Sequence, residues 1–198
     1  MRTEAHRWLF AVALAGILLA LLAAGCAQKT DPRVRQLLKD ASAHASKAAE
    51  VTKSIDAFNK DWQTLITGQA NPQVAAKLED LLSRTKASET ASLNETKAAR
   101  DDYARAAKLP LSSGWKKYID LRHQALDEQE KFLATELQAM DQRIKVAKGE
   151  AAGDPITSLI QLEKKIETLE QESAAHAKRA GELYKKASDY YKEHKLGG

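Results

Sequence analysis

The sequence predicts an all-α fold, an antiparallel up-down four-helix bundle with coiled-coil-like heptad packing. Three observations support this prediction. The 198 residues are 29% charged and only 6% aromatic, a composition typical of long helices. Four long segments contain almost no Gly or Pro and are separated by helix-breaking residues. The single cysteine cannot form an internal disulfide, so packing has to hold the helices together.

Helix boundaries follow from short capping patterns. Three helices begin at an Asp-Pro or Asn-Pro pair, and these pairs start at Asp31, Asn71 and Asp154. Asp or Asn caps the first turn, and Pro at the first helical position lacks only an N–H that would be unpaired. The remaining helix begins near Ser112, after Pro110 has ended the helix before it. The predicted helices cover residues 33–67, 72–108, 114–148 and 155–195.

Matched helix lengths and heptad spacing predict how these helices pack. At about 1.5 Å per residue the four segments are of similar length, which favours antiparallel neighbours. The first and fourth helices place apolar residues at alternating spacings of three and four, from Val34 to Leu65 and from Leu159 to Tyr190. The same pattern is compatible with self-association. Two looser helical hairpins remain an alternative arrangement.

The first 25 residues have the pattern of an export signal. Arg2 and Arg7 precede an uncharged run from Trp8 to Gly25, and the chain never becomes as apolar again. One alternative is that this run stays as an uncleaved membrane anchor, since it is near the lower length limit for a spanning helix. Either way, the helical domain is expected outside the cytoplasmic membrane.

The end of this segment, Leu22-Ala23-Ala24-Gly25-Cys26, resembles the lipobox of bacterial lipoproteins. The resemblance implies that residues 1–25 are a lipoprotein signal peptide. It also implies that Cys26 becomes the first residue and carries diacylglycerol, with acyl chains such as palmitate, on its sulfur. Residues 26–31 would then be a lipidated N-terminus and short tether, followed by the bundle over 32–198. The alternative is an ordinary signal peptide followed by an incidental cysteine.

The residue after the cysteine bears on localisation. Residue 27 is Ala, and not the Asp that in bacterial lipoproteins signals retention in the inner membrane. In a bacterium with two membranes, the resemblance therefore implies the outer membrane, facing the periplasm. In a bacterium with one membrane, it implies the outer face of the cytoplasmic membrane.

The predicted topology gathers charge at one end of the bundle. Helices that alternate direction from Cys26 bring residues 29–40, 100–122 and 178–198 together, with 16 basic residues, 8 acidic residues and all five tyrosines. Lysine and aromatic side chains favour an anionic lipid surface. The alternative is that the tyrosines belong to the core and the lysines are simply solvated. The better surface candidates are Lys116, Lys117, Lys185, Lys186 and Tyr191.

Three histidines raise the question of a metal. His44, His123 and His176 each follow a carboxylate by one helical turn, the spacing that di-metal bundles use for ligands. The second helix offers no matching pair, so histidines satisfied by neighbouring groups are the preferred interpretation. We therefore expect no metal and no cofactor, and a metal-binding bundle is the least favoured hypothesis.

The middle of the second helix is a face of small residues. Close helix approach accounts for it, since small side chains let backbones come together. If the backbones stay apart, the same face lines a polar void in which a small ligand could bind. The residues of this candidate ligand face are Thr85, Ser88, Ser92 and Thr96.

The expected function is contact and not catalysis. The sequence contains no Gly-rich phosphate loop, nucleophile elbow or zinc-protease motif, so we name no catalytic residue. We expect a non-enzymatic interaction or structural module of the bacterial cell envelope, anchored to the membrane by lipid. Its partner would be an envelope protein or the cell wall. Its net charge is too mild to indicate nucleic acid. The main alternative is a bundle that senses or carries a small ligand.

Overall fold

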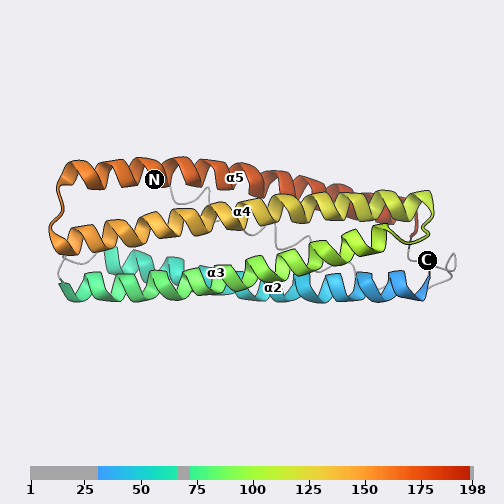
Figure 1. Ribbon diagram of the computed structural model, residues 1–198, viewed down its shortest axis with the longest axis horizontal. Coiled ribbons are helices and arrows are strands. Elements are labelled where there is room, and N and C mark those ends of the chain that lie inside the picture. The colour runs from blue at the N-terminus through green and yellow to red at the C-terminus, as the bar shows by residue number, and fades with distance from the viewer. Residues whose placement is uncertain (1–30, 67–71, 197–198) are drawn as a thin grey trace.

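The computed structural model describes residues 31–66 and 72–196, which form an antiparallel four-helix bundle (Figure 1). The predicted all-α up-down fold is confirmed, and the described residues contain no strand. The lipobox-like segment and Cys26 lie outside the described residues. The helices are α2 (Pro32–Ile66), α3 (Pro72–Ala107), α4 (Ser113–Ala152) and α5 (Ile156–Glu193).

The predicted caps at Asp31 and Ser112 are confirmed, while the one at Asn71 lies outside the described residues. A carboxylate oxygen of Asp31 accepts a hydrogen bond from the Arg33 amide at 2.8 Å, as expected for an N-cap. At the end of α4, Gly153 adopts a left-handed conformation with φ of 75°, which glycine allows without strain. The predicted capping by Asp154 is wrong. Pro155 occupies the N-cap of α5, and no side chain there accepts a hydrogen bond.

The helices pack against one another in chain order. Within the described residues, close backbone packing joins α2 to α3, α3 to α4 and α4 to α5. The contact between α3 and α4 joins the two hairpins into one bundle. Figure 1 shows that the start of α2, the α3–α4 connection and the end of α5 lie at the same end of the molecule. We call this the aromatic end, and the opposite one the far end.

The apolar core is divided between the two ends. At the aromatic end, all four helices contribute to one buried cluster, which includes Ala41, Tyr103, Leu126 and Tyr184. At the far end, where the side chains of α2 are not described, a smaller buried cluster joins α3 and α4. The first turns of α5 contribute little, because Ile156 is 75% exposed and Ile160 is 43% exposed. None of the described helices is long and apolar enough to cross a membrane.

Candidate functional site at the aromatic end

Three aromatic side chains cluster where α4 begins and α5 ends. Trp115 lies edge-on to Tyr118, with ring centroids 5.8 Å apart, and edge-on to Tyr191 at 6.1 Å. The Tyr118 and Tyr191 rings are 5.3 Å apart. These contacts join the two helices and build an aromatic wall. Trp115 and Tyr191 remain half-buried, so part of the wall faces solvent.

A cavity of about 140 Å³ lies against this wall. All four helices contribute to its lining, so it exists only because the bundle is assembled. Apolar and aromatic side chains dominate, and Lys39 and Ser42 supply the polar groups. The lining residues are Leu38, Lys39, Ser42, Tyr103, Trp115, Tyr118 and Tyr191.

Next to Tyr103 of the cavity lining, α4 carries a buried arginine. Arg122 is only 4% exposed, and its guanidinium carbon lies 5.5 Å from the Tyr103 ring centroid and 5.0 Å from that of Tyr184. No described carboxylate pairs with Arg122, and its Nε atom has no hydrogen-bond partner. Burial alone would lower the pKa of Arg122, but the neighbouring Tyr103 and Tyr118 phenols raise the pKa above its usual value. Arg122 is therefore a permanent positive charge inside the bundle.

The buried tyrosines stay neutral beside this charge. Burial raises the pKa of Tyr118 and of Tyr184 well above the ordinary value for a phenol. The Tyr184 hydroxyl donates a hydrogen bond to Gln129, and the Gln129 amide donates to Thr96 at 3.5 Å. This relay links α5, α4 and α3. Tyr103, Tyr118 and Tyr184 are thus core residues.

The predicted surface lysines are exposed at the aromatic end. Lys117 lies 3.8 Å from Asp120, while Lys116, Lys185 and Lys186 form no ion pair with any described residue. Tyr191 differs from them because its ring packs against Trp115 and Tyr118. The structure therefore leaves Lys116, Lys185 and Lys186 unpaired with any described residue, pairs Lys117 with Asp120, and places Tyr191 mainly in the aromatic wall.

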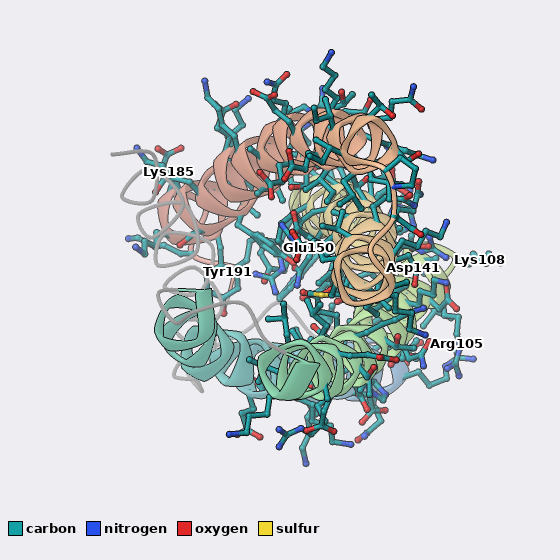
Figure 2. All side chains as sticks on the ribbon, turned by 90° about the vertical axis from the view of Figure 1, so that its left-hand side faces the viewer. Arg105, Lys108, Asp141, Glu150, Lys185 and Tyr191 are labelled. Carbon is teal, nitrogen blue, oxygen red and sulfur yellow. The ribbon has the colours of Figure 1, made fainter. Side chains whose placement is uncertain are left out.

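The basic residues surround this end. Residues 31–40, 100–122 and 178–196 carry 15 Lys and Arg against 8 Asp and Glu. Figure 2 shows Lys185 on the opposite side of the molecule from Arg105 and Lys108. A surface that covers the end of the bundle would meet more of these charges than a partner bound to one side.

Two of the predicted histidines pair with carboxylates on neighbouring helices. His44 lies 2.6 Å from Glu95 of α3, and His176 lies 2.7 Å from Glu128 of α4. The same-helix carboxylates suggested by the spacing are not their partners, because the inward side of each helix faces its neighbour. His123 is half-buried. In the described part of the chain, no group of three His, Cys, Asp or Glu side chains could hold a metal ion.

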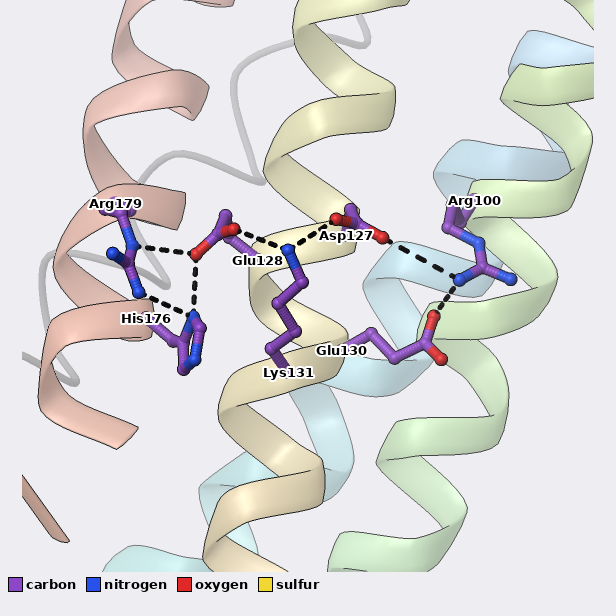
Figure 3. Close-up of polar contacts among 7 residues, drawn as sticks. All are labelled: Arg100, Asp127, Glu128, Glu130, Lys131, His176 and Arg179. Atoms are coloured by element: carbon purple, nitrogen blue, oxygen red, sulfur yellow. Dashed lines mark hydrogen bonds and ion pairs between the residues drawn. The ribbon is translucent and has the colours of Figure 1, made fainter. Parts of the chain in front are cut away.

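Glu128 is the centre of an ion-pair network across α3, α4 and α5 (Figure 3). It accepts hydrogen bonds from Lys131 at 2.8 Å and Arg179 at 2.9 Å in addition to its contact with His176. Although desolvation opposes the shift, the hydrogen bonds from Lys131 and His176 lower the pKa of Glu128 to about 2. The network continues through Lys131 to Asp127 and Arg100. It links α3, α4 and α5 through side-chain contacts.

A buried carboxyl group lies in the middle of α3. Glu89 is only 2% exposed, and one of its carboxylate oxygens has no hydrogen-bond partner. Burial and the nearby charge of Glu136 raise the pKa of Glu89 to about 8, against the opposing effect of Arg143. Arg143 itself pairs with Glu170 at 2.6 Å. Glu89 is therefore protonated at neutral pH and separates the two apolar clusters.

The small-residue face of α3 is mostly buried between helices. The Ser92 hydroxyl donates to the Ala48 carbonyl of α2 at 3.1 Å, and the Thr85 hydroxyl donates to Leu81 of its own helix at 2.9 Å. Thr96 accepts from α4 as described above, and Ser88 is half-buried. These contacts match the close-approach interpretation. The cavity at the aromatic end lies elsewhere and does not include this face.

The sequence interpretation missed Arg122, Glu89 and the cavity. Arg122 follows Ile119 by three residues and precedes Leu126 by four, so spacing alone places it on the buried face of its helix. Glu89 is placed in the same way between Thr85 and Ser92. The cavity had no comparable signal, because its lining comes from all four helices.

Comparison with known proteins adds no family. No protein-family model, curated protein or solved structure gives a significant match to this chain. Its function has to be argued from the residues themselves.

Proposed function

We propose that this chain is a lipid-anchored, extracytoplasmic helical module of the bacterial cell envelope. In this proposal it acts by contact and not by catalysis, and its partner is an envelope protein or the cell wall. Diacylglycerol on Cys26 holds it to the membrane. The aromatic end faces the anionic lipid surface, and the far end is presented to the partner.

The observation that carries this proposal is that the start of α2 and the surplus of basic residues lie at the same end of the bundle. α2 begins at Pro32, six residues after Cys26, and its start lies at the aromatic end (Figure 1). The basic surplus lies at that same end. A chain tethered at residue 26 would hold this end near the membrane, where each Lys or Arg contributes about 1 kcal/mol of attraction. One acyl chain alone binds only marginally, so such a second contribution would strengthen the anchor.

A small-ligand-binding bundle is the second candidate, and the cavity favours it. The cavity is lined from all four helices and combines aromatic walls with one lysine and one hydroxyl, the mixture typical of ligand sites. This candidate is compatible with a lipid anchor. In this second candidate function the ligand site is the cavity at the aromatic end, and not the small-residue face of α3 that the sequence suggested.

The anchor is tested by Cys26→Ser in the full chain expressed in a bacterium. We expect wild-type protein to incorporate labelled palmitate and to remain with membranes after a high-salt wash. Cys26→Ser should incorporate no palmitate, because serine offers no thiol for acylation. It should also be found in the soluble fraction if the leader is still removed.

Gln28→Ser is the matched control, because it changes a residue beside the lipobox-like segment and leaves Cys26 in place. This variant should behave like wild type. Palmitate incorporation by Cys26→Ser, or a wild-type protein without palmitate, would contradict the proposal. Membrane retention of both proteins with neither carrying palmitate would favour an uncleaved anchor.

A further inference from the structure

We propose that the cavity at the aromatic end binds a single sugar ring that carries one carboxylate or phosphate. The proposal stands on the size of the cavity, the chemistry of its lining and the charges around it. It does not depend on the lipid anchor, so the two proposals can fail separately.

The size of the cavity limits the ligand to one ring. Its volume is about 140 Å³. A closed protein cavity of roughly 150 Å³ is known to hold a benzene molecule, so this one has room for a single six-membered ring but not for a disaccharide or a full acyl chain. The charged substituent of the ring would have to lie in the open mouth of the cavity, on the side of Lys39. Half-buried Trp115 and Tyr191 in the lining leave the cavity reachable from solvent. A larger molecule could therefore insert one terminal ring.

The lining suits a ring with apolar faces and polar edges. Trp115, Tyr118 and Tyr191 meet edge to face or tilted and offer flat apolar surfaces, against which the C–H groups of a sugar ring can pack. Lys39 and Ser42 supply an ammonium and a hydroxyl that donate hydrogen bonds. This combination of apolar walls with a few polar groups is typical of small-molecule sites.

Charge selects an anionic ring over a neutral or cationic one. The lining contains Lys39 and no carboxylate. Arg122 lies behind Tyr103, which lines the cavity, and the ion pairs of the described residues include none that neutralises it. A buried charge is poorly screened, so its field acts on the cavity. These two cations exclude a quaternary ammonium ligand, which aromatic walls alone would otherwise suit.

Binding is measured with glucuronate and glucose 6-phosphate as probes, and with glucose and glucosamine as the neutral and cationic controls. The protein is the full chain in a detergent without a sugar headgroup, carrying Trp8→Phe and Trp62→Phe so that Trp115 is its only tryptophan. We expect both anions to change Trp115 fluorescence, with a Kd in roughly the millimolar range for so small a ligand. Glucose should bind at least about tenfold more weakly, and glucosamine should not bind.

Two variants locate the site. Lys39→Gln removes the charge at an exposed position and should weaken glucuronate binding about tenfold, as expected when a charge-assisted hydrogen bond is lost. Ser42→Leu fills the cavity and should abolish the fluorescence change. Lys47→Gln is the matched control, because Lys47 is another exposed lysine of α2 that does not line the cavity. It should bind like wild type.

Vesicles identify where the ring comes from. Vesicles with phosphatidylinositol carry the same headgroup charge as vesicles with phosphatidylglycerol but add a ring. Stronger binding to the first, lost in Ser42→Leu, would place the ring on a lipid headgroup, and equal binding would assign it to a soluble or glycan sugar. Both results support the proposal if the free anions bind. Failure of both anions to bind, equal affinity for glucose, or unchanged binding by Lys39→Gln and Ser42→Leu would overturn it.

Discussion

Arg122 and Glu89 are both buried, but the bundle treats their charges in opposite ways. Arg122 keeps its charge because aromatic faces and neutral phenols surround it. Among the described side chains, the charges that act on Glu89 are Glu136, which repels its carboxylate, and Arg143, which is already paired with Glu170. In such surroundings the protonated, neutral form of a buried carboxyl has the lower free energy.

Glu89 should make stability depend on pH. The pKa of its carboxyl is raised to about 8 in the folded protein, so between pH 4.5, its ordinary pKa, and about pH 8 the folded state binds one proton more than the unfolded state. This stabilisation is complete below pH 4.5 and is lost as pH rises to about 8. Glu89→Gln stays neutral at every pH. At pH 8.5 we expect its free energy of unfolding to exceed that of wild type by roughly 2–4 kcal/mol, so that it unfolds at a higher urea concentration.

The comparison is made by urea unfolding of residues 27–198, which include every described helix, at pH 4.5 and pH 8.5. Near pH 4.5 the wild type and Glu89→Gln should have similar stability. Glu182→Gln is the control, because Glu182 is exposed and should show no such difference. An equal stability difference between wild type and Glu89→Gln at both pH values would refute the assignment.

Sequence spacing could have located both residues, but not their environment. Each falls on the buried face of its helix by a local count of three and four positions. Which groups surround them depends on neighbouring helices. The same limit applies to His44 and His176. Their carboxylate partners lie 51 and 48 residues away in sequence, and helical spacing within one segment cannot reveal them.

At the scale of elements, small side chains determine how closely α2 and α3 approach. Ala48 is fully buried, and its backbone carbonyl accepts a hydrogen bond from Ser92 of α3. Such a contact requires a side chain of α3 to reach the backbone of α2. Larger residues at this position would hold the helices apart.

Ala48→Leu should therefore destabilise the bundle, by roughly 1–3 kcal/mol or more, because the added atoms have no space. Urea unfolding of residues 27–198 measures the effect. Ala43→Leu is the matched control, because Ala43 is an exposed alanine of the same helix and leucine is a good helix former. If both variants unfolded at the same urea concentration, the close approach of α2 and α3 would be ruled out.

The elements themselves were predictable because their signals are local. Proline positions, the glycine at position 153 and the heptad spacing all act within a few residues. Asp154 shows the limit of such signals. It precedes a proline as Asp31 does, yet the chain reaches it directly from the turn at Gly153, and it does not cap the next helix.

At the scale of the whole molecule, the surplus of basic residues at the aromatic end can be tested directly. Changing Lys116, Lys117, Lys185 and Lys186 together to Gln removes four positive charges from exposed positions. We expect residues 27–198 with these changes to lose most of their binding to phosphatidylglycerol vesicles, because each lysine near an anionic surface contributes about 1 kcal/mol. Vesicle co-sedimentation at low salt measures the loss.

A matched set of four exposed lysines lies toward the far end, and none of them forms an ion pair with a described residue. These are Lys77, Lys145, Lys164 and Lys165. Changing them to Gln alters the net charge by the same amount and should leave vesicle binding nearly intact. Equal losses in the two sets would mean that only net charge matters and that neither end is turned toward the membrane.

Packing in chain order has a consequence for how this protein folds and opens. Most contacts join helices that are adjacent in the chain, so contact order is low and folding is expected to be fast. The first and last helices contribute to the same core at the aromatic end, where Leu38 and Tyr191 line one cavity. Amide hydrogen exchange should therefore be slowed there by anything that occupies the cavity, while the first turns of α5 continue to exchange quickly.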